Sequence, residues 1–468
     1  MTGWNGAWVA ERLGIALRDA DRPFGAGLRD LVGLAVRRNP RRAHLLVSAV
    51  LGKHVPTDPR LVHGAGLLLG RRIAGLPQPA ADAAGAALRA RPGRRTEPAG
   101  RCAARRAPAG HAAGGAGGPD ARAGDRATPR PRPRSATRWP TPWAAPSTCT
   151  PPARPVPGVP PYGGFEEEHS HATSHLLLPA DPALMETAGP VVLVDDELST
   201  GTTALNTIRA LHAAHPRDHY VLASLVDVRG PQDRARMAAL ADELGARIDA
   251  VALARGRVEL PADVLRAGRE LVAATACAPA PPRPCGRAHP LVRIDLAWPQ
   301  DLPEGGRHGF LPEHRRHLEA ELPAMAARLA ETLPAAARRV LVLGFEELMY
   351  APLRLAEALA DLLPAAQVRY STTTRSPVLA VDDPGYAIRT RLTFPAHDDP
   401  ADGPGERYAY NVAPGGDRDR AFEAIVLVVD RAGDTPLLEK GLAARLRELA
   451  PVTMAVLPVR TPARRGDR

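Results

Sequence analysis

Aromatic residues, lysines and cysteines are all scarce in this chain of 468 residues. Aromatic side chains make up only 4% of it although 44% is hydrophobic, so any core must rest on alanine, leucine and valine. Lysine occurs only at Lys53 and Lys440, and arginine supplies the remaining basic side chains. The cysteines lack the spacing of a disulfide framework or a zinc site, which argues against both. They are Cys102, Cys149, Cys277 and Cys285.

Long apolar runs are lacking as well. No segment has the run of hydrophobic residues that a membrane-spanning helix needs. The N-terminus does not have the basic and then apolar form of a signal peptide. We therefore expect a cytoplasmic protein with no membrane partner. A chain of this length predicts two or three domains.

The basic charge of the chain is concentrated in one segment. The net charge is +10, which on its own would suit a nucleic-acid partner. Residues 89–154, however, hold fourteen arginines and only three acidic residues, so the remaining chain is close to −1. Because the charge does not extend over the regions that carry regular patterns, we expect no nucleic-acid partner.

The most informative stretch runs from Val191 to Thr203. Four apolar residues are followed by Asp195 and Asp196, and a small polar turn then leads to an expected helix from Ala204 to His212. Backbone N–H groups at a helix N-terminus can surround a phosphate. Carboxylates at the end of a strand can hold sugar hydroxyls or a magnesium-bound ligand. The turn residues that we assign to a phosphate are Ser199, Thr200, Gly201, Thr202 and Thr203.

This stretch resembles the signature of type I phosphoribosyltransferases. That signature consists of an apolar strand, two acidic residues and a Ser-Thr-Gly-x-Thr-like turn. The resemblance implies that Asp195 and Asp196 bind the ribose hydroxyls of phosphoribosyl pyrophosphate with its magnesium. It implies that residues 199–203 bind the 5-phosphate and that Mg²⁺ is the cofactor. We assign no direct protein ligand to the metal and no catalytic residue. An ordinary buried strand with an acidic turn is the alternative.

Residues 86–154 form a low-complexity basic stretch where the resemblance would place the first core strand and the pyrophosphate loop. Apolar periodicity disappears between residues 89 and 153, and Trp139 and Trp143 stand among prolines. A disordered linker is one interpretation. The other is a frame-shifted core, because residues 126–153, read in the neighbouring frame with permitted wobble bases, can encode a loop, an amphipathic helix and a strand. In that case we expect this chain to have lost activity.

Residues 1–85 are expected to form a helical N-terminal segment of the first domain, because Leu28, Leu31 and Leu34 recur at helical spacing. Residues 41–56 resemble the opening of a phosphoribosyltransferase subfamily found in bacterial tellurium-resistance gene clusters. Lys53 and His54 are expected on a loop after a strand. A ligand contact and a solvated loop both remain open for them.

Residues 155–276 are expected to form the core that holds the signature. Its first part is rich in glycine and proline, which fits a mobile loop that closes over an active site. Acidic and histidine side chains follow there, and metal binding, substrate contact or acid–base work, and a solvated polar strand remain open for them. The residues that we assign to contacts of this loop are Glu166, Glu167, Glu168, His169 and His171.

A proline-rich linker at residues 277–290 precedes a second domain at 291–468, which repeats the order of the first. Val340–Leu359 reads as strand, loop and helix, and Ile425–Asp430 parallels Val191–Asp196. The second copy has lost the acidic pair, and Asp434 would repel a phosphate. We therefore expect a degenerate phosphoribosyltransferase-like domain.

Residues 374–377 spell Thr-Arg-Ser-Pro and resemble the TRSP domain that follows this transferase subfamily. We assign Arg375, Glu346 and Glu347 to contacts with a second substrate. A purely structural partner domain is the alternative.

The sequence thus predicts an α/β protein with a helical N-terminal segment and two Rossmann-like domains of phosphoribosyltransferase type. The resemblance implies transfer of a phosphoribosyl group to an unknown base-like acceptor, in a pathway linked to tellurium resistance or stress. A non-catalytic sensor of phosphoribosyl compounds or nucleotides is the alternative. The expected partners are small-molecule substrates, and a homodimer is compatible with the sequence.

Overall fold

The computed structural model of the protein describes residues 7–39, 42–75, 161–166, 174–186, 189–276, 288–346, 348–397 and 405–459. These ranges lie in one compact unit formed by residues 1–93 and 146–468. The basic stretch at 86–154 lies outside the described residues, so the linker and frame-shift interpretations both remain predictions. None of the described helices is long and apolar enough to cross a membrane.

The first sheet has four strands in the order β1-β8-β7-β6, and β1 alone runs antiparallel to its neighbour. Its strands are β1 (Ala16–Asp21), β6 (Val191–Leu198), β7 (His219–Asp227) and β8 (Arg247–Glu259). Helices α6 (Thr202–Ala214) and α7 (Pro231–Leu244) connect the three parallel strands. Strand and helix therefore alternate over this region, in line with the α/β class that the sequence predicts.

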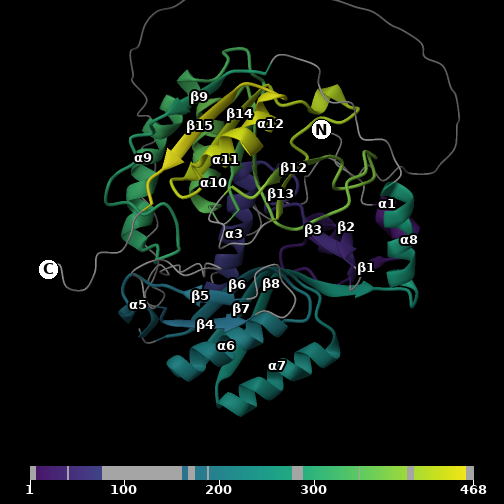
Figure 1. Ribbon diagram of the computed structural model, residues 1–468. Helices are drawn as coiled ribbons and strands as arrows, with labels where there is room; N and C mark the ends of the chain where they lie inside the picture. The colour runs from purple at the N-terminus through teal and green to yellow at the C-terminus, as the bar shows by residue number, and fades with distance from the viewer. Residues whose placement is uncertain are drawn as a thin grey trace, which may run out of the picture. The chain divides into compact units, whose positions relative to one another are not determined.

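Side chains of β7 point alternately to the two faces of the sheet and pack into a different hydrophobic core on each face. Tyr220 and Leu222 pack with Ile208 of α6 and Leu240 of α7, and Figure 1 shows both helices on that side of the sheet. Ala223 and Leu225 belong to the opposite core, which holds α3 (Pro59–Ala74). Because successive strand residues point to opposite faces, one apolar strand serves both layers. Among the described strands β6 lies at the edge of this sheet, and its Val194 is 69% exposed.

The predicted helical N-terminal segment is helical only in part, because strands lie between helices α1 and α3. Leu28 and Leu31 do belong to a one-turn helix, but Leu34 lies in a β-hairpin, where it pairs with Leu46. Short apolar runs fit helical and extended spacing equally well. Here the pairing between two strands determines that the run around Leu34 is extended. The elements are α1 (Ala7–Leu13), α2 (Leu28–Leu31), β2 (Val32–Asn39) and β3 (Arg42–Ser48).

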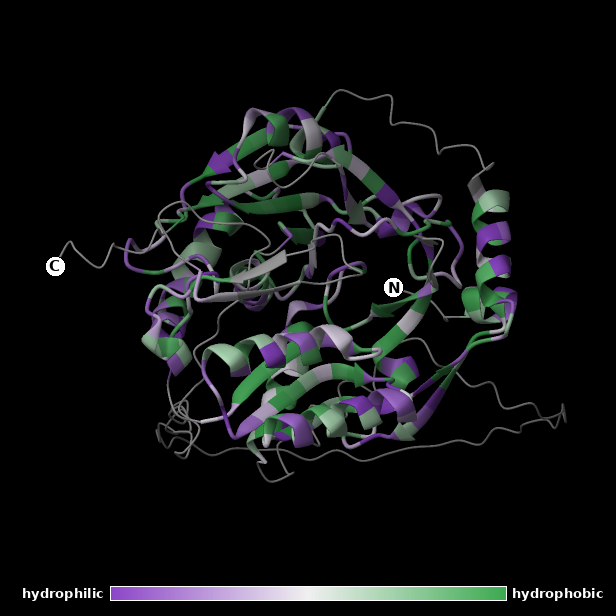
Figure 2. Ribbon diagram, turned by 60° about the horizontal axis from the view of Figure 1, so that its bottom comes forward, coloured by the Kyte–Doolittle hydropathy of each residue, from purple (hydrophilic) through white to green (hydrophobic). Residues whose placement is uncertain are grey.

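Helix α8 (Val264–Ala276) packs on this hairpin. A Cβ at Gly268 would lie 2.7 Å from the Cβ of Ala43, so only glycine permits this approach. Figure 2 shows hydrophobic and hydrophilic residues alternating along α8, as expected for a helix with one buried face. Between α3 and β6 the structure describes β4 (Gly163–Glu166), β5 (Ser174–Leu177) and α5 (Ala183–Glu186).

The second sheet is wholly parallel, in the order β11-β10-β14-β15-β9. Every residue of β14 is buried, because helices cover both faces of the sheet. The sheet strands are β9 (Leu291–Ile294), β10 (Arg339–Gly344), β11 (Gln367–Thr372), β14 (Ala424–Asp430) and β15 (Val452–Leu457). The covering helices are α9 (Pro312–Glu331) and α10 (Tyr350–Leu362) on one face, and α11 (Pro436–Leu438), the π-helical turn Glu439–Ala443 and α12 (Ala444–Arg447) on the other.

A hairpin of β12 (Arg391–Pro395) and β13 (Glu406–Tyr410) precedes β14, and a short 3₁₀ turn, Arg418–Arg420, lies between β13 and β14. Residues around this hairpin join the first half of the chain. The ring of Tyr386 packs against that of Trp8 at a tilt of 46°, and its hydroxyl accepts a hydrogen bond from the backbone of Val36. The two halves therefore share one hydrophobic core rather than meeting only at their surfaces.

Candidate functional site

Two adjacent carboxylates lie near the carboxyl end of β6. The strand continues through Asp195 and Asp196 to Leu198, beyond the four apolar residues that suggested it. Asp195 is exposed and Asp196 is half-buried. The backbone N–H of Asp196 donates to Oδ1 of Asp195 at 2.8 Å. The pair therefore lies where parallel α/β sheets place their ligands.

The two carboxyl groups differ in their affinity for protons. Loss of solvation and, after it, the adjacent charge of Asp196 raise the pKa of Asp195 to about 8, although part of the residue remains exposed. Burial acts in the same direction on Asp196, but Lys53 and a hydrogen bond from Asp195 outweigh it and lower the pKa of Asp196. The two adjacent carboxyl groups therefore disfavour carrying two negative charges at once.

The turn after β6 leaves a helix N-terminus without a side-chain cap. Gly201 is the N-cap residue of α6 and adopts a left-handed conformation, with φ of +74°. Glycine has no side chain with which to satisfy the first N–H groups of the helix. The hydroxyls of Thr200 and Thr202 lie 3.1 Å apart at the same place. Hydroxyls and helix N–H groups together form an arrangement that binds anions.

A buried ion pair lies behind this turn. Arg229 donates to both carboxylate oxygens of Asp227, each at 2.9 Å, and both side chains are almost fully buried. A Cβ added at Gly201 would lie 3.3 Å from Cδ of Arg229. The pair therefore supports the turn from behind. Sequence reasoning missed it, although an Asp-x-Arg pattern at the end of the next strand was a usable signal.

A lysine from far away in the sequence lies beside the acidic pair. Lys53 Nζ is 3.6 Å from Oδ2 of Asp196, and Lys53 lies on the loop between β3 and α3, as predicted. Its neighbour His54 is buried against Tyr410. Burial and the charge of Lys53 lower the pKa of His54 to about 3, so His54 is neutral. Of the two alternatives for Lys53, its position beside Asp196 favours a ligand contact.

Residues 31–102 and 148–257 match the family described as phosphoribosyl transferase, and residues 304–446 match the TRSP domain, described as lying C-terminal to it. The chain belongs to this family of phosphoribosyl transferases with a C-terminal TRSP domain. The transferase match omits residues 103–147, which lie within the basic stretch. The curated proteins and the solved structures contain no match to the chain.

The assignments of the other residues to the transferase site remain predictions. Glu166 ends β4, and nothing is described of its side chain. Glu167, Glu168, His169 and His171 lie outside the described residues. Within the described ranges, no group of three histidine, cysteine or acidic side chains could hold a metal ion.

The TRSP domain brings Glu346 and Arg375 together. Nε of Arg375 lies 2.5 Å from Oε2 of Glu346, and Nε of Arg407 lies 2.6 Å from Oε1. Glu346 has a positive φ of 40°, a strained conformation for this residue. Glu347, the third residue that we assigned to a second substrate, lies outside the described residues.

The turn after β14 in the TRSP domain is closed by its own hydrogen bonds. Gly433 N–H donates to Oδ1 of Asp430 at 2.8 Å, and Thr435 Oγ1 accepts from Leu438 N–H at 3.2 Å. Asp434, expected to repel a phosphate, pairs with Arg293 at 3.0 Å. The N–H groups of this turn are thus engaged internally, whereas after β6 the N–H of Thr202 makes a longer hydrogen bond, of 3.4 Å, to Oγ1 of Thr200.

Proposed function

We propose that the chain transfers a phosphoribosyl group from phosphoribosyl pyrophosphate to a base-like acceptor. The observation that carries this proposal is the acidic pair on β6, followed directly by the uncapped N-terminus of α6. Asp195 and Asp196 would orient the ribose hydroxyls. Residues 199–203 would hold the 5-phosphate through their backbone N–H groups and hydroxyls. The family match supports this reading at the level of the transferase class.

The chemical step requires the protein to position the two substrates rather than to form a covalent intermediate with them. A nucleophilic atom of the acceptor forms a bond to C1 of the ribose while the bond from C1 to the pyrophosphate oxygen breaks, and pyrophosphate leaves with the electron pair. The side chains hold the ribose in the orientation for this displacement. Lys53, beside Asp196, supplies a positive charge close to the anionic substrate.

Magnesium fits this site as a companion of the substrate. Mg²⁺ is commonly bound by one or two carboxylates together with substrate phosphates, rather than by a cage of protein ligands. The described residues offer such a pair, Asp195 and Asp196, and no larger cluster. When bound, the ion would neutralise charge on the departing pyrophosphate.

The second domain would serve the same reaction as a degenerate copy of the first. We assign Arg375, Glu346 and Glu347 to the acceptor, and Glu166, Glu167, Glu168, His169 and His171 to a loop that covers the substrates. The ion pair between Arg375 and Glu346 would have to open for either side chain to bind the acceptor. The link to tellurium resistance or stress rests on the resemblance of residues 41–56.

A sensor that binds phosphoribosyl compounds without catalysis is the alternative function. It is favoured by one observation, the omission of residues 103–147 from the transferase match. A binding turn without a complete core would still hold a phosphate but would not align the reactants. Release of pyrophosphate with candidate bases present separates the enzyme from the sensor.

Titration calorimetry with phosphoribosyl pyrophosphate and magnesium tests the site itself. We expect the wild-type chain to bind and the double variant Asp195→Asn, Asp196→Asn to lose at least about tenfold in affinity, since charge-assisted hydrogen bonds to the ribose are removed. Equal binding by both proteins, or none by either, would overturn the assignment.

A further inference from the structure

Lys53 lies on a loop whose backbone is bound by the TRSP domain. We call residues 52–57 the Lys53 loop; it connects β3 to α3 in the transferase domain. Only two lysines occur in a chain otherwise rich in arginine, and one of them is placed beside the acidic pair. A lysine is a compact charge, whereas an arginine is a planar fork, so the two are not interchangeable at a crowded site.

Both ends of the Lys53 loop are fixed by β11. The carbonyl of Gly52 accepts hydrogen bonds from Ser371 Oγ at 2.7 Å and from Thr372 N–H at 3.1 Å. Thr57 exchanges two backbone hydrogen bonds with Tyr370, at 2.8 and 2.9 Å. Gly52 has φ of +79°, and a Cβ there would lie 2.6 Å from the Tyr370 ring, so the loop lies directly against that strand.

Asn411 holds the middle of the loop. Its Nδ2 donates to the carbonyl of His54 at 2.9 Å and to that of Ala387 at 2.8 Å. Its Oδ1 accepts from Arg389 N–H at 2.8 Å and from Nη2 of Arg420 at 3.3 Å. The donors and acceptors around the amide fix its orientation. Asn411 is buried and adopts φ of +57°, which asparagine tolerates better than most residues.

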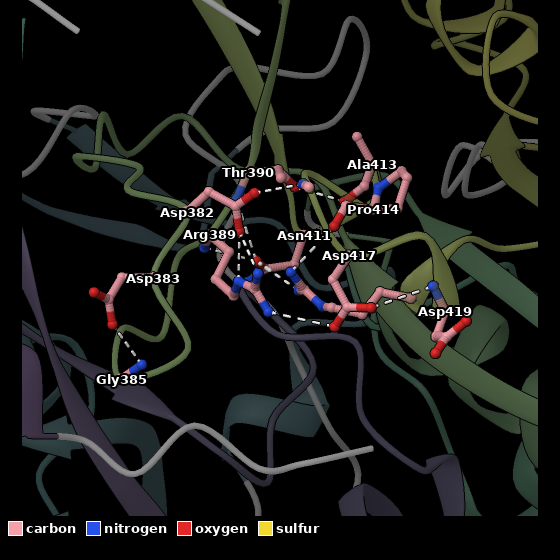
Figure 3. A network of polar contacts seen from close by, with 12 residues as sticks. Asp382, Asp383, Gly385, Arg389, Thr390, Asn411, Ala413, Pro414, Asp417 and Asp419 are labelled. Carbon is pink, nitrogen blue, oxygen red and sulfur yellow. Dashed lines mark hydrogen bonds and ion pairs between the residues drawn. The ribbon is translucent and has the colours of Figure 1, made fainter.

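Asn411 is surrounded by a network of polar contacts within the TRSP domain. Figure 3 shows the guanidinium of Arg389 between Asp382 and Asp417. Asp382 also accepts from Gly416 N–H at 2.6 Å. The amide that reaches His54 is therefore anchored to two loops of the second domain.

We propose that Asn411 is a positioning residue of the phosphoribosyl pyrophosphate site, through which the TRSP domain presents Lys53 to Asp196 and to the anionic substrate. For the identity of the substrate beside Lys53, this inference rests on the proposed function. The TRSP domain then completes the transferase site, and Asn411 does so without contacting the substrate.

The scarcity of lysine gives a direct test that needs no substrate. Reductive methylation with ¹³C-formaldehyde keeps the charge and labels Lys53, Lys440 and the N-terminal amine, so few signals are expected in the NMR spectrum. Asp196→Asn gives the position of the Lys53 signal without its partner. In Asn411→Gly, which keeps the left-handed backbone, we expect the Lys53 signal to move toward that position while exposed Lys440 stays unchanged.

Asp417→Asn is the matched control, because it weakens the same network without reaching the loop. Asn411→Asp is a second variant that keeps an acceptor but loses the donor to His54, and it should move the Lys53 signal as Asn411→Gly does. A Lys53 signal that stays in place in both Asn411 variants, or that moves equally in Asp417→Asn, would overturn the proposal.

Measurements of substrate binding then test whether Asn411 acts on the substrate through Lys53. We expect Asn411→Gly to weaken binding of magnesium phosphoribosyl pyrophosphate by about threefold to tenfold, the worth of its one hydrogen bond to the Lys53 loop. In a Lys53→Met background the same change should weaken it no further, because Asn411 acts through Lys53. Additive losses would show a merely structural role. If no chain binds but the Lys53 signal still moves, the proposed function fails while the hold of Asn411 on Lys53 stands.

Discussion

At the scale of single residues, the neighbouring aspartates differ by what lies beside each of them. Lys53 stabilises the charge on Asp196, whereas Asp195 has a carboxylate as its closest partner. The pKa values of two chemically identical groups are therefore shifted in opposite directions. Ionisation of Asp195 would let both of its carboxylate oxygens accept hydrogen bonds from ribose hydroxyls.

Binding of magnesium phosphoribosyl pyrophosphate is accordingly predicted to release a proton near pH 7. Since the pKa of Asp195 is raised to about 8, the free group is mostly protonated at pH 7 and mostly ionised at pH 9. Affinity should rise with pH up to about 8 and then level off. Calorimetry at pH 7 in buffers of different ionisation enthalpy measures the proton, and Asp195→Asn should abolish the buffer dependence. Heat that is independent of the buffer in the wild-type chain would contradict this.

At the scale of elements, the turn between β6 and α6 depends on the conformation of one glycine. Gly201 combines a positive φ with close approach of the Arg229 side chain. Both constraints arise from the chain itself and not from a ligand. The turn is therefore shaped before any phosphate arrives, which lowers the cost of binding.

Gly201→Ala is predicted to lower the free energy of unfolding by about 1–2 kcal/mol, the cost of a left-handed conformation with a side chain. Affinity for the 5-phosphate should fall as well, because the added methyl group shifts the turn. Urea unfolding and calorimetry measure the two effects. Gly64→Ala in α3 is the control, since nothing lies within 4 Å of its added Cβ. A stable Gly201→Ala protein with unchanged affinity would argue against a preformed turn.

Elements set by local patterns were predictable, and contacts between distant segments were not. The strand and turn around Asp195 and Gly201 follow from apolar residues and turn residues that are adjacent in the sequence. The hairpin containing Leu34 was missed, because its extended form depends on pairing with Leu46. The ion pair of Lys53 with Asp196 depends on how the loop before α3 packs, and no local pattern encodes it.

At the scale of the whole molecule, the transferase and TRSP domains are not separable modules. Val36 and Leu68 of the first domain share a core with Val378 and Ile388 of the second. The backbone bridges between Thr57 and Tyr370 cross the same boundary. A family boundary in the sequence is therefore not a boundary in the packing.

The described unit is predicted to unfold in a single cooperative transition. A fragment of residues 1–290 should show no such transition, because removing the second half exposes the shared core and costs more than the typical margin of about 5–15 kcal/mol. Differential scanning calorimetry and near-ultraviolet circular dichroism measure this. Co-expression with residues 291–468 should restore the transition. Two separate transitions in the full chain, or a folded fragment, would contradict the prediction.

The edge position of β6 has a consequence for the chain in concentrated solution. Within the described residues β6 is bonded to β7 alone, whereas its counterpart β14 lies between β10 and β15. An open strand edge with an exposed valine is a template on which further strands can add, and natural sheets usually guard such edges with charge. Asp195, Asp196 and Glu197 lie along this same edge, so their like charges would disfavour the pairing of β6 with a second copy of the chain.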